Sequence, residues 1–369
     1  MTGGAGFIGS HTVDELLRLG HTIKVLDSLE PPVHVERTPP TYLDSRCELT
    51  MGDVCDEAIL LRSLSSCDAV FHFAAFQDYL PQFSKFMRVN VVSTALLYEL
   101  IVREKLPVRR VIVASSQAAM GEGLYRDASG RTLTPDIRSR EQLDRGEWEV
   151  APPSGYAGPL VSLKSDEGVS NPQNQYGLSK LAEENVAIQL GRRYEIPTVA
   201  LRYSIVQGPR QSVYNAYSGA CRIFSLSFRE GREPTIFEDG AQLRDFVNIE
   251  DVVAANMIAL FDHRTDYEVL NVGGGQAYTV SDFAKVVARA YGINQYEPKA
   301  SGKYRFGDTR HIFSDISKIL RLGWKPRRSV EDSVLAYKAW LSELSVGGGV
   351  LAHAERQMEQ LGVVRSVRQ

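Results

Sequence analysis

Two side chains in the middle of the chain have the types and the spacing of an acid–base pair. Tyr176 and Lys180 lie four residues apart in QYGLSK, at the start of a helical pattern, so both face the same side of that helix. A tyrosine hydroxyl has a pKa of about 10 and is a poor base at neutral pH, but a nearby ammonium group favours the phenolate. The pair could therefore take a proton from a substrate hydroxyl.

Two serines could complete this pair. Ser115 and Ser116 end the apolar run RRVIVASS, and parallel α/β sheets bind ligands at the carboxyl ends of their strands. A hydroxyl at that edge can bridge the tyrosine and a substrate oxygen. The structural alternatives are an ordinary amphipathic surface helix for Tyr176 and Lys180, and capping of the strand end for the serines.

A second group of residues has the spacing of a phosphate-binding turn. Gly3, Gly6 and Gly9 recur at every third residue, directly before a helical pattern. Such a turn lets backbone N–H groups approach a diphosphate, and the helix N-terminus adds partial positive charge. Asp27 ends the next short strand, where a carboxylate can accept hydrogen bonds from a ribose diol and would repel a 2′-phosphate. The pattern predicts a dinucleotide site that prefers NAD to NADP.

The elements that must position these residues alternate along the chain. Continuously apolar runs that end at residues 27, 75, 116 and 204 are separated by helical patterns. Strands without a polar face are typical of a parallel sheet that is covered by helices on both sides. The sequence therefore predicts an α/β fold with a doubly wound parallel sheet of the Rossmann type.

The pattern also divides the chain. We expect the NAD-binding domain over residues 1–204, with an insertion over about 121–172 that is rich in Gly, Pro and charge. Residues 205–344 have a mixed pattern, which predicts a smaller substrate domain with some segments returning to the first domain. Residues 345–369 are expected to form a tail with a glycine hinge and a loose helix.

The start of the chain departs from this fold. A doubly wound sheet has its central strand immediately before the glycine turn, and here only Met1 and Thr2 precede it. Loss of that strand would leave backbone groups unpaired, at about 1–3 kcal/mol for each buried group. We therefore expect that the natural start lies upstream, that the numbering omits tag residues, or that another segment fills the place.

Composition excludes several classes of function. The chain has 369 residues, a formal net charge of -3 and 43% hydrophobic residues, which is ordinary for a globular protein. Without a basic excess it is not expected to bind nucleic acid, and no apolar run approaches the roughly 18–20 residues that cross a bilayer. The four cysteines form no Cys-x-x-Cys pair and have no histidine at ligand spacing, which predicts free thiols in a cytoplasmic protein and no metal site.

Several motifs in order carry a resemblance to a known family. TGGAGFIG, HFAA, the serine strand, YGLSK and LRYSIVQGPRQ resemble the extended short-chain dehydrogenase/reductases, and among them the NAD-dependent nucleotide-sugar epimerases and dehydratases. The nearest likeness is to 4-epimerases of dTDP-L-rhamnose or UDP-glucose, over residues 1 to about 340. The resemblance implies Ser116, Tyr176 and Lys180 as the catalytic residues. It implies that NAD is contacted by Gly3, Gly6, Phe7, Ile8, Gly9, Asp27, Ser28, Asp53, Val54, Phe73, Ala74, Ala75, Asn90, Tyr176, Lys180 and Tyr203.

The resemblance extends to a substrate site. The segments DGAQLRDFVNIEDV and YRFGDTRH are similar to diphosphate-binding segments of the family, and they imply that Arg244 and Arg305 hold phosphate oxygens. Arg210 and Arg310 are weaker candidates, and the alternative for all of these charges is solvated surface. The further contacts expected with the UDP- or dTDP-linked sugar are Gln77, Ser116, Gln117, Ser204 and Asp308.

The implied reaction is inversion of C4 through a transient 4-keto sugar. Tyr176 as phenolate takes the 4-hydroxyl proton, and the C4 hydride moves to NAD and returns to the opposite face. A 4,6-dehydratase typically has Asp and Glu after the strand-end hydroxyl residue, where this chain has Gln117 and Ala118. A UDP-uronate 4-epimerase stays open, although such enzymes often have an arginine at the place of Ser212. A sensor or scaffold that binds NAD or a nucleotide sugar also stays open, and the resemblance implies a homodimer.

Overall fold

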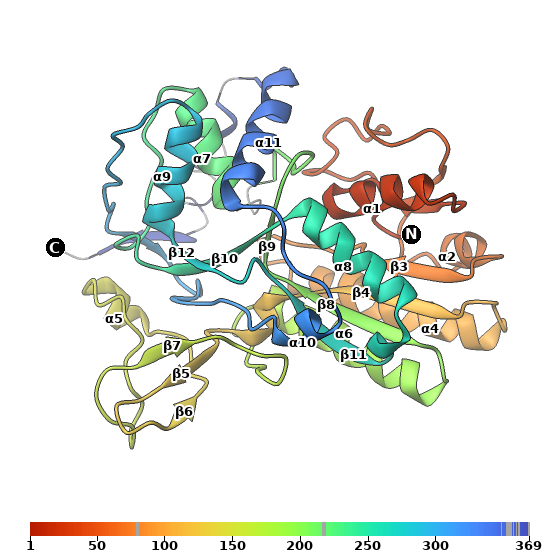
Figure 1. Ribbon diagram of the computed structural model, residues 1–369, viewed down its shortest axis with the longest axis horizontal. Helices are drawn as coiled ribbons and strands as arrows, with labels where there is room; N and C mark the ends of the chain where they lie inside the picture. The colour runs from red at the N-terminus through yellow and green to blue at the C-terminus, as the bar shows by residue number, and fades with distance from the viewer. Residues whose placement is uncertain are drawn as a thin grey trace.

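The computed structural model describes residues 1–78, 81–215, 219–347, 349–351, 356, 358, 360 and 362–367. Its main sheet lies in the right half of Figure 1 and is parallel throughout. The strand order is β2 (Glu48–Met51), β1 (Lys24–Asp27), the start of the chain, β3 (Ala69–His72), β4 (Arg110–Ser116), β8 (Thr198–Tyr203) and β11 (Glu268–Val272). The prediction of a doubly wound α/β sheet is confirmed.

Helices cover both faces of this sheet. One face carries α2 (Glu57–Leu64), α4 (Ser93–Arg103) and α6 (Gln175–Arg193), and the other carries α1 (Phe7–Arg18), α8 (Ile249–Phe261) and α10 (Ser317–Arg321). Neighbouring strand residues alternate between the two cores: Val111 and Val113 pack under α4 and α6, and Ile112 packs under α1 and α8. Because both faces are buried, the strands have no polar side, which explains their continuously apolar sequence.

The first residues of the chain occupy the place of the central strand. The Thr2 amide donates to the Phe71 carbonyl at 2.9 Å, and the Met1 carbonyl accepts from the Leu26 amide at 2.8 Å. Thr2 thus bridges β1 and β3 in parallel register. The expected gap is filled at the carboxyl edge of the sheet, where the glycine turn begins.

A second region lies at the upper left of Figure 1 and has a core of its own. Its mixed sheet joins β9 (Ile205–Gln207), β10 (Leu243–Asn248) and β12 (Ala277–Thr279). This sheet packs with α7 (Ala220–Arg229), α9 (Val280–Ala290) and α11 (Val330–Glu343) around phenylalanines that include Phe224, Phe246 and Phe283. Between β10 and β12 the chain returns to the main sheet to form α8 and β11.

The insertion forms a small antiparallel sheet at the lower left of Figure 1. It contains β5 (Leu124–Arg126), β6 (Thr132–Leu133), α5 (Arg140–Asp144) and β7 (Val161–Leu163). Most of the predicted tail helix falls outside the described residues. Near the end of the tail, β14 (Val364–Ser366) pairs with β13 (Lys303–Arg305), a pairing that the sequence pattern does not predict.

Short helical segments connect these parts, and they include α3 (Phe83–Phe86), the π-helix η1 (Met87–Val92), and the 3-10 helices η2 (Gln117–Met120) and η3 (His263–Thr265). All four cysteines are free, as predicted. Among the helices of the described residues, none is both long enough and apolar enough to span a bilayer.

Candidate active site

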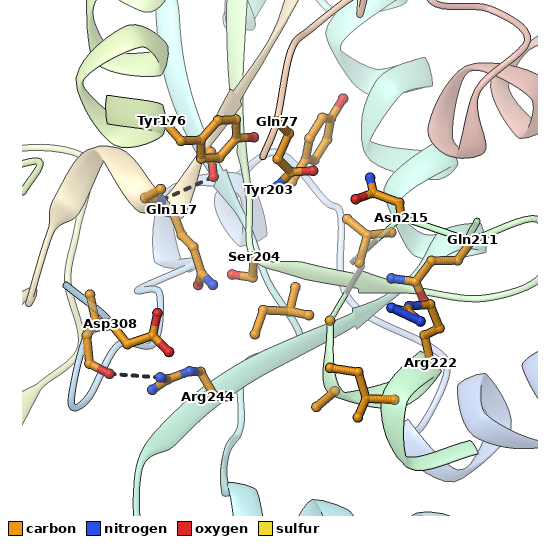
Figure 2. Close-up of a pocket in the computed structure, with 18 of the residues that line it drawn as sticks. Gln77, Gln117, Tyr176, Tyr203, Ser204, Gln211, Asn215, Arg222, Arg244 and Asp308 are labelled. Atoms are coloured by element: carbon orange, nitrogen blue, oxygen red, sulfur yellow. Dashed lines mark hydrogen bonds between the residues drawn. The ribbon is translucent and has the colours of Figure 1, made fainter. Parts of the chain in front are cut away.

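A cavity of about 830 Å³ lies between the carboxyl edge of the main sheet and the second region. Its wall includes the glycine turn, the ends of β4 and β8, the start of α6, and parts of α7, β10 and β13. Figure 2 shows Tyr176, Gln77 and Gln117 entering the cavity from the side of the main sheet. Arg244 and Asp308 face them from the lower left, and Arg222 lies at the lower right.

The glycine turn has a close-packed backbone that leaves no room for side chains at Gly3 and Gly9. Gly3 has a φ of +67°, and a Cβ there would lie 2.7 Å from the Ala74 amide nitrogen. A Cβ on Gly9 would overlap the Gly3 carbonyl oxygen, so α1 can approach the turn only without one. Gly6 caps α1 without a side-chain hydrogen bond, which leaves the first N–H groups of the helix to a ligand. This geometry fits the diphosphate of a dinucleotide.

Local packing places Tyr176 over the end of β4. The Asn174 side chain caps α6 by accepting from the Gly177 amide at 2.8 Å. A Cβ on Gly177 would overlap the Ala118 carbonyl oxygen, so the helix start lies directly against η2. Burial raises the pKa of the Tyr176 phenol above its usual value, and the Lys180 ammonium and a hydrogen bond with Ser116 oppose part of this rise. The structure thus brings together the three predicted catalytic residues.

Lys180 is held firmly beneath the tyrosine. Its side chain is 2% exposed, and its Nζ donates to the Ala114 carbonyl and to Glu183 Oε2, both at 2.7 Å. An ammonium group has three hydrogens, so these two bonds leave one for a hydroxyl in the cavity. That arrangement suits the ribose next to a nicotinamide.

The opposite wall carries positive charge. Arg244 donates through Nη1 to the Arg310 carbonyl at 3.0 Å and through Nη2 to the Thr309 carbonyl at 2.8 Å. These acceptors are neutral carbonyls, and the carboxylates of Asp308, Glu238 and Glu122 offset part of the guanidinium charge. Arg305 pairs with Asp308 at 2.7 Å and stacks over the Phe237 ring at 4.9 Å. Two fixed guanidinium groups on one wall can bind the phosphates of a sugar nucleotide.

Most of the predicted site residues line this cavity. Gln117 is notable among them because its Oε1 is buried and has no hydrogen-bond partner among the described residues, as expected of a group that awaits a ligand. The predicted residues in the wall are Gly3, Gly6, Phe7, Ile8, Gly9, Phe73, Ala75, Gln77, Ser116, Gln117, Tyr176, Lys180, Tyr203, Ser204, Arg244, Arg305 and Asp308.

Other predicted cofactor contacts lie beyond the cavity wall. Asp27 Oδ2 accepts from the Ala5 amide at 3.0 Å and so supports the glycine turn. Ser28 and Asp53 are exposed, and Asp53 faces Arg88 at 3.7 Å. Val54 is buried in the core under α2, so only its backbone can face an adenine. The roles of these residues, and of Ala74 beside the turn, stay predictions.

Three predicted residues are not in the cavity wall, and their contacts with ligands stay predictions. Asn90 does not contact the cavity, because the π-helix η1 turns it inward, where its amide binds the Phe76 backbone and donates to Ser179 Oγ at 2.8 Å. Arg210 pairs with Asp14 of α1 at 2.7 Å. Arg310 is fully buried and binds carboxylates of Glu149, Glu238 and Asp239. All three side chains position other segments.

Some wall residues were missed by sequence reasoning. Gln211, Asn215, Arg222 and Phe237 line the cavity, and Figure 2 places the first three together near α7. Gln211 directly follows the GPR motif, so it could have been proposed from its position. Arg222 lies on a helix face that looks like ordinary surface in the sequence, yet it is 1% exposed and donates to the Val213 carbonyl at 3.1 Å.

Buried ion pairs and hydrogen bonds connect the insertion to the wall that carries Arg244 and Arg305. Arg138 binds both carboxylate oxygens of Glu238, at 3.0 and 2.9 Å, and its Nη2 donates to the Asp308 carbonyl at 2.8 Å. Glu122 Oε2 accepts from the Arg310 amide at 2.7 Å. The segment that carries Arg305 and Asp308 is therefore held by residues of the insertion.

Comparisons with known proteins agree with this geometry. The model of the NAD dependent epimerase/dehydratase family matches residues 1–144 and 149–273. The chain is similar to the dTDP-L-rhamnose 4-epimerase of Burkholderia thailandensis, with 33% identity over 349 residues that cover 93% of this chain and 94% of that protein.

Solved structures are similar over nearly the whole chain. The UDP-glucose 4-epimerase of Thermotoga maritima with UDP-glucose has a TM-score of 0.73 and 27% identity, and covers 93% of this chain and 97% of its own. The UDP-glucose 4-epimerase of Thermus thermophilus with NAD has a TM-score of 0.71 and 25% identity, with 94% and 98% covered.

Proposed function

The chain belongs to the NAD-dependent epimerase/dehydratase family, and from that premise we propose that it is an NAD-dependent 4-epimerase of a nucleotide-diphosphate hexose. The single observation that carries the proposal is the placement of Tyr176 and Lys180 in one cavity wall, between the glycine turn and the Arg244–Arg305 wall. The proposed base, the proposed dinucleotide site at the glycine turn and the two arginines proposed to bind the diphosphate then face the same cavity. Cofactor binding alone could use Lys180, but it does not require the tyrosine hydroxyl that lies between the lysine and the sugar-nucleotide side of the cavity.

In the proposed reaction the chain moves one proton and holds the sugar. Tyr176 as phenolate takes the proton of the 4-hydroxyl, Ser116 holds the sugar oxygen, and Lys180 keeps the phenolate stable. NAD, when bound, would supply the redox chemistry for removal of the C4 hydride and for its return. Arg244 and Arg305 hold the diphosphate while the 4-keto sugar turns, and Tyr176 then returns its proton to the inverted oxygen. No net proton or hydride is lost in the cycle.

The residues after Ser116 favour epimerisation over dehydration. Dehydration must remove the C5 proton and protonate the departing 6-hydroxyl, and neither the amide of Gln117 nor the methyl of Ala118 transfers protons at neutral pH. The similarity to a dTDP-L-rhamnose 4-epimerase supports dTDP-linked 6-deoxyhexoses as the first sugars to test. UDP-hexoses follow, because the solved relatives named above are UDP-glucose 4-epimerases.

A turnover assay tests the proposal. Purified protein with NAD is incubated with dTDP-L-rhamnose, dTDP-glucose, UDP-glucose and UDP-glucuronate, and the sugar ring protons are followed by NMR. The proposal expects a C4-inverted product from at least one of these compounds and no 4-keto-6-deoxy product. Tight NAD binding without any inverted product would instead favour a sensor or scaffold.

We further propose a cytoplasmic homodimer. The four free thiols support a reducing compartment. Apolar side chains are exposed on η1 and α6, with Val92 at 54% and Leu178 at 48%. A second copy could bury this surface through paired helices. Light scattering of the wild type and a Val92→Asp/Leu178→Asp variant tests the dimer, which should become a monomer in the variant.

A further inference from the structure

Glu183 is a buried carboxylate with a single described partner, the Lys180 ammonium. It follows Lys180 by one turn of α6, is fully buried, and its Oε2 lies 2.7 Å from Nζ. Its other oxygen, Oε1, has no hydrogen-bond partner within the described residues. Burial of an incompletely bonded carboxylate is costly, so this residue needs an explanation.

The next residue shows what a structural carboxylate looks like in the same helix. Glu184 accepts from Arg202 Nε and Nη2 at 2.8 and 2.7 Å, and from Ser115 Oγ at 2.7 Å. Its two oxygens are bonded, and together they tie α6 to β4 and β8. Glu183 makes no such tie, because its described contact lies within its own helix. Its effect therefore falls on the charge and the position of Lys180.

We propose that Glu183 is a positioning residue that fixes the Lys180 ammonium beneath Tyr176 and offsets part of its positive charge. The carboxylate and the Ala114 carbonyl take two hydrogens of the ammonium and direct the third into the cavity. The offset follows from Coulomb attraction, because a phenolate near a neutralised ion pair gains less than one near a bare cation. The inference rests on the proposed function only for the role of Tyr176 as base.

The other side chains described around Lys180 and Glu183 do not offset the charge of the Lys180 ammonium. From α6 come Tyr176 and Glu184, and from β8 comes Arg202, which is neutralised by Glu184. From β3 comes His72, whose pKa is lowered to about 3 by burial and then by Lys180, so it is uncharged at neutral pH. The buried polar side chains of η1 and α4 are uncharged, namely Asn90, Ser93, Thr94 and Tyr98.

The sign of the effect follows from the order of ionisation. Burial raises the pKa of Glu183 to about 7, partly opposed by Lys180. Tyr176 ionises above that pH, when Glu183 already carries its negative charge, and this charge raises the pKa of the phenol. A neutral side chain at position 183 should therefore move the ionisation of Tyr176 to lower pH.

The experiment measures phenol ionisation without any substrate. NAD-loaded wild type, Glu183→Gln and Glu183→Ala are titrated by absorbance near 295 nm, and Tyr176→Phe in each background is subtracted to isolate one phenol. We expect the midpoint to fall by about 0.5 pH unit or more in both variants. Gln and Ala share the change of charge but differ in volume, so a common shift reports charge. Glu99→Gln is the control, because it removes a carboxylate that is 60% exposed on α4 and pairs with Arg103, and it should leave the midpoint in place.

The outcomes separate this inference from the proposed function. Where turnover exists, the acid limb of kcat/KM should shift in parallel with the phenol midpoint. An unchanged midpoint in folded Glu183 variants, or a collapse of both variants without any folded protein, overturns the positioning role. A shifted midpoint in a protein that turns over no sugar nucleotide overturns the proposed function alone.

Discussion

The two ends of the cavity are built in different ways. The dinucleotide end comes from one short stretch, in which the glycine turn follows Thr2 and is supported by Asp27 and the end of β3. The sugar-nucleotide end combines β10, the segment after β13 and the insertion, which meet through Arg138, Glu238 and Arg310. One end depends on backbone geometry and the other on buried charges.

This difference separates the causes of affinity at the two ends. Gly3 and Gly9 allow the backbone of the turn to pack closely against its neighbours and against a ligand. The N-terminus of α1 is then open to a dinucleotide without support from remote segments. The proposed binding of phosphate by Arg244 and Arg305 requires that remote segments hold these side chains, because a guanidinium on a loose segment loses conformational entropy on binding. Substitutions that break the contacts between the insertion and this wall should therefore weaken sugar-nucleotide binding and leave the affinity for NAD unchanged.

The largest expected effect lies where the two ends meet. Tyr176→Phe removes the proton acceptor and keeps the ring, so turnover should fall about 1,000-fold, or roughly 4 kcal/mol in the barrier. Binding of NAD and of the sugar nucleotide, measured by calorimetry, should each change less than about threefold because the aromatic ring stays and only its hydroxyl is lost. Turnover close to that of the wild type would remove Tyr176 from the reaction.

The next effect tests whether the insertion serves only one end. Arg138 is 3% exposed, and its replacement by Met leaves Glu238 and Glu122 buried near a neutral side chain. Loss of one partner of a buried pair should lower the free energy of unfolding by about 3 kcal/mol. Urea titration measures this value, and KM for the sugar nucleotide should rise while the Kd for NAD stays within about twofold.

The matched control for this change is in the same insertion. Arg145→Met removes an exposed arginine whose pair with Glu147 is 59% and 57% exposed. Exposed pairs contribute at most about 1 kcal/mol, so stability and KM should both stay near the wild-type values. If the affinity for NAD falls while KM for the sugar nucleotide rises in Arg138→Met, the two ends are not independent.

The same contrast explains how far the sequence could predict the molecule. Tyr176 and Lys180, and the three glycines, are close in sequence, so helix and turn geometry alone place them correctly. Arg244 and Arg310 stand in similar motifs, and only their partners, carbonyls for one and carboxylates for the other, separate a ligand site from a buried network. The inward orientation of Asn90 could not be predicted, because a π-helix has no clear signal in a single sequence.

A smaller effect is expected inside the positively charged wall. Arg305→Gln removes the charge that faces the cavity, and a charge-assisted bond to phosphate contributes about 1.5–3 kcal/mol. The value of kcat/KM should therefore fall about 10- to 100-fold, mainly through KM. Lys299→Gln, at a side chain that is 78% exposed and pairs with Glu233, is the control and should leave KM unchanged.

The smallest effect belongs to the dinucleotide end. Asp27 supports the glycine turn through the Ala5 amide, and Leu29 N also donates to it at 3.0 Å. Asp27→Asn keeps an acceptor but removes the charge, so NAD affinity should fall only about fivefold, near 1 kcal/mol. Discrimination against NADP should fall with it, because the neutral amide no longer repels a 2′-phosphate.

Calorimetry with both dinucleotides checks this last prediction, and Asp56→Asn is its control, since Asn caps α2 as well as Asp does. The sugar-nucleotide KM at saturating NAD should not change, because Asp27 lies outside the cavity wall. A loss of NAD affinity with unchanged preference over NADP would mean that Asp27 acts only on the turn. Such a result would make the dinucleotide end as dependent on positioning residues as the sugar-nucleotide end.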